Sequence, residues 1–347
     1  MLRFWSATVC ALLALTPAAQ AQDTVAQFYK GKTIDLIIGT APGGGYDIYS
    51  RIIAHTLPRY IPGEPAVVPR NMPGAGSRRA TLQIYSGAKD GLAIAAIFPG
   101  AVIEPLFTGI EAARYDPAKL VYLGSANNEV SLCLARADAK VKSFADAQKT
   151  ELIVGATQSS GSTRDFPLLL NKTVGTKFKL VGGYPGSREI ALALDRGEVE
   201  GVCGYHWSSL VSQKPEWLAE KKVTVLVQLG FKSHPDADKL GIPQIWEFVT
   251  NETDKRVVEL VLGQLVVGRP YVAAPGTPPE RIAALREAFA RTMQDKTFLA
   301  EAQNAKLDVD PAPGEDVQKL LERMYATPPQ LIKRAAEAIG FKPNEAN

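Results

Sequence analysis

A glycine-rich stretch is the first place in this sequence where residue types suggest chemistry. It reads GTAPGGGYDI and follows the apolar run 34–38, so three glycines separate a predicted strand from a predicted helix. Glycine accepts positive φ and lacks a Cβ, so successive N–H groups there can point at one anion. No Lys-Ser or Lys-Thr follows and the spacing is not G-x-G-x-x-G, which excludes the common nucleotide loops. The candidate residues are Ala41, Pro42, Gly43, Gly44, Gly45, Tyr46 and Asp47.

Three further loops have a similar make-up, which weakens the alternative that the first is a tight turn with nothing bound. PGAG at 73–76 precedes a helix that Ser77 can cap, SSGST occupies 159–163, and YPGS occupies 184–187. In open α/β sheets, ligands bind at the carboxyl ends of strands, where such loops gather. These loops add the candidates Gly74, Ala75, Gly76, Ser159, Ser160, Gly161, Ser162, Thr163 and Gly186.

Charged and nucleophilic residues near the loops leave two alternatives open. Each of four arginines could reach an anionic ligand or be a solvated charge at a helix start: Arg78, Arg79, Arg164 and Arg188. A Ser-dependent hydrolase is the second alternative, but no G-x-S-x-G elbow exists. His206, in the aromatic stretch GYHWSS, is expected to pack or to line a rim rather than to catalyse. The scattered histidines and few cysteines do not predict a metal site.

The elements that position these loops alternate along the chain. β-type runs are predicted over 34–38, 66–68, 92–97, 120–123, 130–134, 152–156, 178–181, 199–203 and 223–229. Amphipathic helices are predicted over 47–57, 77–86, 166–172 and 187–196, and further helices in the C-terminal third. This alternation indicates an α/β fold with mostly parallel sheets and a helical C-terminal tail.

The N-terminus predicts an exported protein, and the overall charge bears on its partners. MLRFWSATVCALLALTPAAQA has the apolar core and A-x-A end of a secretory signal, so residues 1–21 are predicted to be cleaved after Ala21. The chain has 347 residues, enough for two domains. Its net charge of +3 falls by one when Arg3 leaves with the signal, which argues against nucleic acid as a partner.

Six segments, in order, resemble landmarks of the Bug-type periplasmic solute-binding proteins, which serve tripartite tricarboxylate transporters. They are YKGKTIDLIIGTAPGGGYDIYSRIIA, VPRNMPGAGSRRA, KDGLAIA, SSGST, GYPGSREIALALDRGEVEG and APGTPPERIAALREAF. The resemblance covers nearly the whole mature chain. It implies a type II, Venus-flytrap fold in which two lobes close on a small organic carboxylate, di-, tricarboxylate or aromatic.

For the site, the resemblance implies that one carboxylate is held by backbone N–H groups and small hydroxyls of the first three loops. It adds Pro99, Tyr184 and Tyr205 to the candidates. Tyr46 departs from the family, which often has a small hydroxyl residue there. The expected partners are one large and one small integral membrane transporter subunit, with a signalling partner as an alternative. The protein is expected to be a periplasmic monomer without a cofactor or catalytic activity.

The domain organisation follows from the resemblance rather than from periodicity. The first lobe is expected to comprise residues 22–124 plus 230–347, and the second lobe residues 125–229. Cys133 and Cys203 survive signal cleavage and lie in predicted strands of the second lobe. Adjacent strands would bring them within reach of each other, so we predict a disulfide, with two free buried thiols as the alternative.

Overall fold

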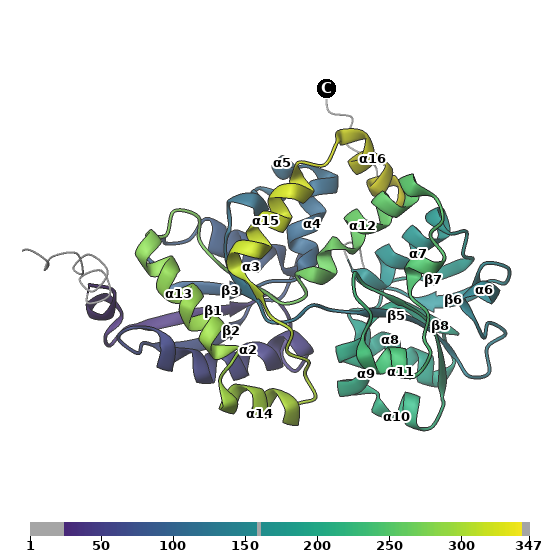
Figure 1. The fold of residues 1–347 in the computed structure, drawn as a ribbon, viewed down its shortest axis with the longest axis horizontal. Helices are drawn as coiled ribbons and strands as arrows, with labels where there is room; N and C mark the ends of the chain where they lie inside the picture. The colour runs from purple at the N-terminus through teal and green to yellow at the C-terminus, as the bar shows by residue number, and fades with distance from the viewer. Residues whose placement is uncertain (1–23, 158–160, 342–347) are drawn as a thin grey trace, which may run out of the picture.

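The computed structural model describes residues 24–157 and 161–341, and the predicted signal peptide lies outside them. The chain forms two sheets with helices on their faces, one sheet in each of two lobes that lie side by side (Figure 1). None of the helices within the described ranges is long and apolar enough to cross a membrane. The two-lobed α/β architecture predicted from the sequence is confirmed.

The first sheet combines parallel and antiparallel strands. In sheet order its strands are β11 (Ala312–Pro313), β4 (Val121–Ser125), β10 (Pro270–Ala273), β3 (Ala93–Ala96), β1 (Thr33–Ile38) and β2 (Ala66–Asn71). Strand β1 is parallel to β2 and β3, whereas β10 is antiparallel to β3 and β4. Buried side chains of β1 and β3 and of helix α2 (Gly45–Thr56) form one core cluster on this sheet.

The second sheet repeats this plan. Its strands in sheet order are β7 (Phe178–Val181), β6 (Leu152–Gly155), β8 (Gly201–His206), β5 (Ser131–Arg136) and β9 (Val223–Leu229). Strand β6 is parallel to β7 and β8, and β5 is antiparallel to β8 and β9. Both sheets are therefore mixed, and most strands of each run in one direction as predicted, because β4 and β9 pair antiparallel with a reversed strand and so run with the parallel set. Each contains one strand that arrives from the other lobe, β10 or β5, and inserts in the reverse direction.

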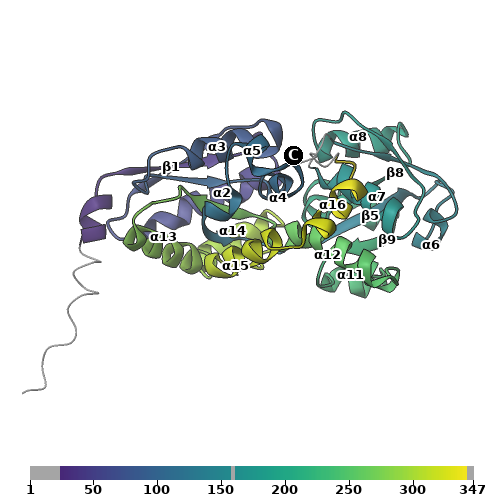
Figure 2. The same ribbon diagram turned by 90° about the horizontal axis from the view of Figure 1, so that it is seen from above.

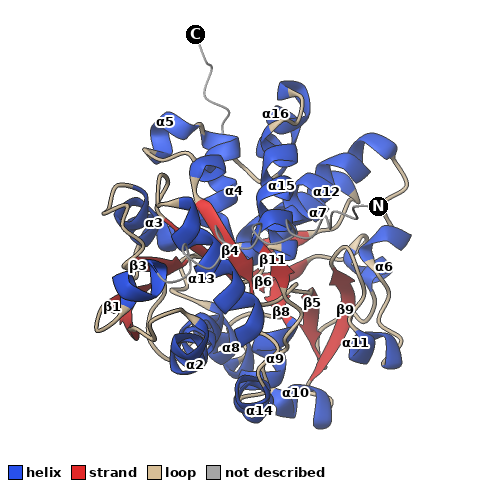
Figure 3. Ribbon diagram, turned by 60° about the vertical axis from the view of Figure 1, so that its left-hand side comes forward, coloured by secondary structure: helices blue, strands red, loops and turns tan. Residues whose placement is uncertain are grey.

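The helices surround the sheets (Figure 3). On the first lobe they are α2, α3 (Arg78–Tyr85), α4 (Pro99–Thr108), α5 (Ile110–Ala113), α13 (Pro279–Thr292), α14 (Lys296–Asn304) and α15 (Gly314–Tyr325). On the second lobe they are α6 (Phe144–Ala147), α7 (Ser162–Thr173), α8 (Ser187–Arg196), α9 (Trp207–Gln213), α10 (Pro215–Ala219) and α11 (Pro235–Lys239). Two more, α12 (Glu252–Val266) and α16 (Pro329–Ala338), lie at the junction between the lobes (Figure 2).

The chain returns to the first lobe later than the boundary at residue 230 that the resemblance implied. Ala237 and Ile242 are buried in the same cluster as side chains of β5 and β8, and Gln228 pairs with Gln244. The segment from 230 through α11 therefore packs on the second sheet, and the first sheet resumes at β10. The apolar contacts of Ala237 and Ile242 therefore place the return of the chain to the first lobe after α11.

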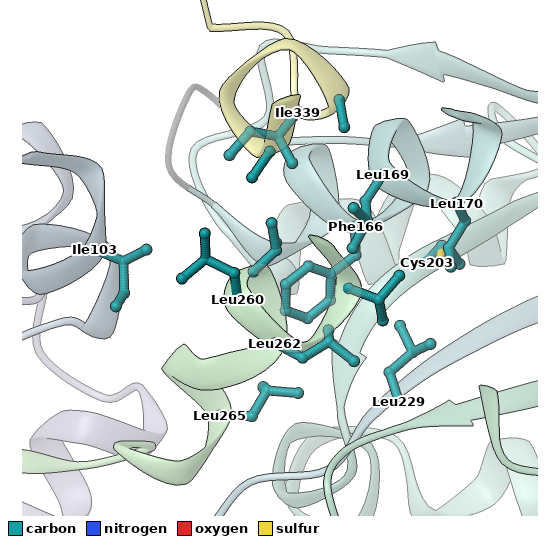
Figure 4. Close-up of a cluster of buried hydrophobic side chains, with 14 of the residues drawn as sticks. Ile103, Phe166, Leu169, Leu170, Cys203, Leu229, Leu260, Leu262, Leu265 and Ile339 are labelled. Atoms are coloured by element: carbon teal, nitrogen blue, oxygen red, sulfur yellow. The ribbon is translucent and has the colours of Figure 1, made fainter. Parts of the chain in front are cut away.

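A hydrophobic cluster near the crossing segments joins the two lobes. Figure 4 shows Leu260 and Leu265 of α12 between Ile103 of α4 and Phe166 of α7, with Ile339 beside them. These side chains are at most 9% exposed. The lobes thus share a buried apolar contact as well as two chain crossings.

The cysteines lie where the prediction placed them, on neighbouring strands. Cys133 of β5 and Cys203 of β8 are register partners, and their sulfur atoms lie at bonding distance. Both side chains are fully buried. The structure pairs the two cysteines as a disulfide, and the oxidation state of the purified protein remains a prediction.

Candidate functional site

A small cavity at the junction shows where the loops of both lobes meet. It is lined by Tyr46, Phe98, Pro99, Glu129, Ser162, His206, Gln264, Leu265 and Gly268. These residues follow β1 and β3 in the first lobe, follow or end β6 and β8 in the second, or belong to the crossing region. The space holds about one water molecule. The carboxyl ends of β1, β3, β6 and β8 therefore converge here.

The first glycine loop ends at the uncapped N-terminus of α2. Gly44 is the N-cap with extended backbone, φ −87° and ψ 170°, and no side chain caps the helix. The first-turn N–H groups of a helix have no intrahelical partner and favour negative charge. A Cβ added to Gly44 would meet nothing within 4 Å. Ala41, Pro42 and Gly43 are exposed, so an anion can approach this end of α2.

Asp47 stabilises the glycine loop instead of facing a ligand. Its carboxylate accepts the Gly43 N–H at 2.8 Å, the Arg51 guanidinium at 3.0 Å and the Asn71 amide at 2.8 Å. Burial acts to raise the pKa of Asp47, but these hydrogen bonds outweigh it, and the pKa lies below its ordinary value. The Gly43 N–H is thereby occupied, which leaves the N–H groups beginning with Gly44 and Gly45 for an anion.

Tyr46 connects the glycine loop to the crossing region. Its hydroxyl donates to the Gly268 carbonyl at 2.7 Å, and its ring lies beside Phe98 with centroids 5.1 Å apart. The Arg269 guanidinium lies over the same ring, 4.0 Å from its centroid. Burial raises the pKa of the Tyr46 hydroxyl to about 12, so it remains a donor at neutral pH. The Tyr46 ring, which is larger than the small hydroxyl residue that Bug-type proteins often have at this position, therefore packs against Phe98 and Arg269 at the junction.

The second loop has an unusual left-handed backbone. Ala75, Gly76 and Ser77 all have positive φ, at 46°, 58° and 72°, and Gly74 has φ 139°. Such conformations are strained for Ala and Ser and tend to occur at functional sites. The Ser77 hydroxyl donates to the Gly39 carbonyl at 2.8 Å, which holds this loop against the first one.

In the third loop the hydroxyls bond to protein and the helix N-terminus is open. Ser162 Oγ donates to the Gly204 carbonyl at 2.8 Å, and Thr163 Oγ1 accepts the Thr157 N–H at 3.1 Å. Gly161 is the N-cap of α7, with no side-chain cap. The structure therefore corrects the expected role of these two hydroxyls: they position the loop. Ser159 and Ser160 lie outside the described residues.

Close approach between β8 and α7 depends on Gly204. Its φ is 85°, and a Cβ there would lie 2.9 Å from the Thr163 nitrogen and closer still to the Ser162 carbonyl. Only glycine combines this backbone angle with this contact. Sequence patterns identified the loops but gave no sign of this glycine.

The remaining candidates are divided between the junction and the core. Pro99 lies at the junction, at the start of α4, whose N-cap Phe98 provides no side-chain cap. Tyr184 and Gly186 lie in the loop before α8, near the β6 end, and outside the cavity lining. Tyr205 is fully buried, packs on Trp217 and bonds Gln213, so the structure corrects its assignment from ligand contact to core.

Of the four arginines beside the loops, two bond to other protein groups and two are exposed. Arg78 donates to the Ala112 carbonyl at 2.8 Å and pairs with Glu104, on the α4 side of the lobe. Arg164 donates to the Ile339 carbonyl at 2.8 Å and so binds the C-terminal end of α16. Arg79 and Arg188 are exposed.

A buried polar group in the crossing region was not predicted from the sequence. Arg269 Nη2 lies 3.1 Å from Glu129 Oε2 and 3.1 Å from Ser208 Oγ, and the Arg269 and Glu129 side chains are 3% and 1% exposed. Ser208 Oγ donates to Glu129 at 2.7 Å. These residues are far apart in sequence and follow no motif, so only the fold reveals their contact.

His206 lies at the second-lobe wall of the cavity. Its Nδ1 is 2.7 Å from Ser131 Oγ. Burial lowers the pKa of His206 to about 4, while Glu129 raises it and Arg269 lowers it by smaller amounts. The imidazole is therefore neutral at pH 7, in agreement with a wall residue rather than a general base.

Comparison with known proteins agrees with this fold. No protein-family model matches the chain. The "UPF0065 protein in gbd 5'region" of Cupriavidus necator is 26% identical over 327 residues, covering 88% of this chain and 86% of that protein. The chain is a homologue of that protein.

Solved structures show the same fold. The Rhodopseudomonas palustris protein Rpa4515 with adipate has a TM-score of 0.68 at 19% identity, covering 90% of this chain and 98% of that one. MatC from the same organism, with bound malate, has a TM-score of 0.65 at 19% identity, with 89% and 99% coverage. The periplasmic binding protein BugD has a TM-score of 0.67 at 17% identity, with 89% and 98% coverage. The predicted resemblance to Bug-type proteins is confirmed in the fold.

Proposed function

We propose that this chain is an exported solute-binding protein that captures a small organic carboxylate between its lobes, without catalysis. The observation that carries the proposal is the meeting of uncapped helix N-termini from both lobes, at α2, α4 and α7, around one junction. Each N-terminus favours negative charge, and together they suit a carboxylate oxygen. Relatives with this fold bind malate and adipate, which supports the same class of ligand.

Delivery to a membrane transporter with one large and one small integral subunit completes the proposal. Two lobes joined by two crossing segments are the arrangement in which hinge closure encloses a ligand. The crossing segments bond to each other, since the Ala126 N–H donates to the Arg269 carbonyl at 3.0 Å and the Glu129 N–H to the Leu265 carbonyl at 2.9 Å. A periplasmic location follows from the predicted signal peptide and from the location of BugD.

A Ser-dependent hydrolase finds no support in the described part of the chain. The serine that contacts a histidine, Ser131, is fully buried, so no substrate reaches its hydroxyl. The low pKa of His206 also makes it a poor base at neutral pH. Ser162 and Thr163 use their hydroxyls to bond the protein itself.

Thermal unfolding with a carboxylate panel tests the proposal. Malate, adipate and monocarboxylates of similar size are compared with their uncharged amides at equal concentration. A ligand at 100 times its Kd raises the free energy of unfolding by about 2.7 kcal/mol. Stabilisation by at least one carboxylate, without its consumption, supports binding. Turnover of an ester or amide substrate, or no stabilisation by any carboxylate, contradicts it.

A further inference from the structure

The charges around the junction cavity suggest which kind of carboxylate fits. Glu129 is the charged side chain among the described residues that line the cavity. Its partner Arg269 is already paired with it, at 3.1 Å, and both side chains are at least 97% buried. The pair is close to electrically neutral as a unit, so it offers no spare positive charge to a ligand.

The second-lobe wall of the cavity is also uncharged at neutral pH. His206 is neutral there, and its Nδ1 is occupied by Ser131. Nε2 is then the ring nitrogen that can bond a neutral polar group of a ligand. The Ser162 hydroxyl of the second lobe, the Gln264 side chain of α12 and the first-lobe rings of Tyr46 and Phe98 also line the cavity, and all of them are uncharged.

Cations elsewhere around the loops either bond to protein groups away from the cavity or are exposed to solvent. Arg78 bonds Ala112 and Glu104, and Arg164 bonds the end of α16. Residues 158–160, which the structure does not describe, read Gln-Ser-Ser and carry no positive charge. The exposed arginines Arg79 and Arg188 are solvated, and an exposed ion pair contributes little to affinity.

We propose that the ligand is a monocarboxylate whose other end is uncharged, which rests on the proposed function above. The helix N-termini hold its single carboxylate, and the far end points toward Tyr46, Phe98 and His206, whose cavity widens beyond the volume of one water molecule to admit it. A second carboxylate there would lose its hydration and meet Glu129 and neutral groups instead of a cation. The neutral wall therefore selects against dicarboxylates, including those that the relatives of this fold bind.

Calorimetric titration with matched pairs tests this selection. Adipate is compared with adipamate, succinate with succinamate, and terephthalate with 4-carbamoylbenzoate, so that within each pair only one charge changes. In the pair that binds most tightly, we expect the monocarboxylate to bind at least tenfold more tightly than the dicarboxylate. Equal or tighter binding of the dicarboxylate overturns the selection while leaving carboxylate binding intact. The absence of binding by any carboxylate overturns the proposed function itself.

Two sets of variants identify the charges responsible. Glu129→Gln keeps the shape of the side chain but frees the Arg269 charge, so the preference should shift at least tenfold toward the dicarboxylate. Because this variant can lose stability, the wild-type pairs provide the primary result. Arg79→Gln and Arg188→Gln, at the exposed arginines, should leave the preference unchanged. If wild type prefers the dicarboxylate and either arginine variant abolishes that preference, an exposed arginine holds the second carboxylate and the proposal is wrong.

Discussion

Replacing Gly204 by alanine should push strand β8 away from helix α7, the two elements that form the second-lobe wall of the cavity. Its left-handed φ of 85° costs an alanine about 1–2 kcal/mol. The added Cβ would also press on the backbone of Ser162 and Thr163, 2.9 Å from the Thr163 nitrogen, and such overpacking typically adds about 1–3 kcal/mol. We therefore expect Gly204→Ala to lower the free energy of unfolding by about 2–5 kcal/mol.

Gly175→Ala is the matched control for this substitution. Gly175 has a similar φ of 74°, but a Cβ there would meet nothing within 4 Å. The control should therefore lose only the backbone contribution of about 1–2 kcal/mol. Urea unfolding measures both variants, and ligand-induced stabilisation should be lost in Gly204→Ala alone. Equal losses of stability, or normal ligand binding by Gly204→Ala, would refute the idea that this contact shapes the site.

Three further predictions concern a titration, a helix end and the cysteines. The pKa of His206 is about 4 in the folded protein and 6.5 in the unfolded chain, so the unfolded chain binds the proton at higher pH. The free energy of unfolding should therefore fall by up to about 3 kcal/mol as the pH drops from 6.5 to 4. Urea unfolding of His206→Gln should lack this pH-dependent loss. Arg164→Ala should lower the free energy of unfolding by about 1–3 kcal/mol, because the hydrogen bond to the end of α16 is lost. Calorimetry should show less than threefold weaker ligand binding. Abolished binding would contradict the assignment of Arg164 to the α16 contact. Intact-mass measurement after alkylation without reductant should find Cys133 and Cys203 unmodified. Reduction should lower the free energy of unfolding by about 4 kcal/mol, because the bond closes a loop with a sequence separation of 70. Two alkylated cysteines would contradict the disulfide prediction.

Local pattern predicted much of the fold because its strands and helices are regular. Val223–Leu229 and Ser187–Arg196 have the predicted bounds, and all nine predicted β-type runs overlap strands β1 to β9. Strands β10 and β11 were missed because they are short and follow or include proline. The reversed direction of the crossing strand β5 was not predicted, since period-two alternation is the same in parallel and antiparallel sheets.

The site was predictable where backbone chemistry defines it and unpredictable where tertiary contacts do. Glycines before helices indicated the loop at Gly44 and the left-handed turn at Gly76. The Arg269–Glu129 pair and the close approach at Gly204 depend on residues distant in sequence, so no local pattern announces them. Tyr205 was assigned to the ligand through the family resemblance, whereas its side chain is fully buried in the second lobe.

The central claim is that the open N-terminus of α2 holds the ligand carboxylate, and Gly44→Asp tests it most directly. Aspartate is a favoured N-cap, the backbone at Gly44 is already extended, and its Cβ meets nothing within 4 Å. The variant's own carboxylate should occupy the ligand position, so thermal stability should stay level or rise by up to about 1 kcal/mol.

The decisive measurement is calorimetric titration of wild type, Gly44→Asp and Gly44→Ala with the tightest carboxylate of the panel. The account predicts at least a hundredfold loss of affinity in Gly44→Asp with the fold intact, and less than a tenfold loss in Gly44→Ala, which adds only a methyl group. Wild-type affinity in a folded Gly44→Asp variant would contradict it, because the carboxylate would then bind somewhere other than the α2 N-terminus.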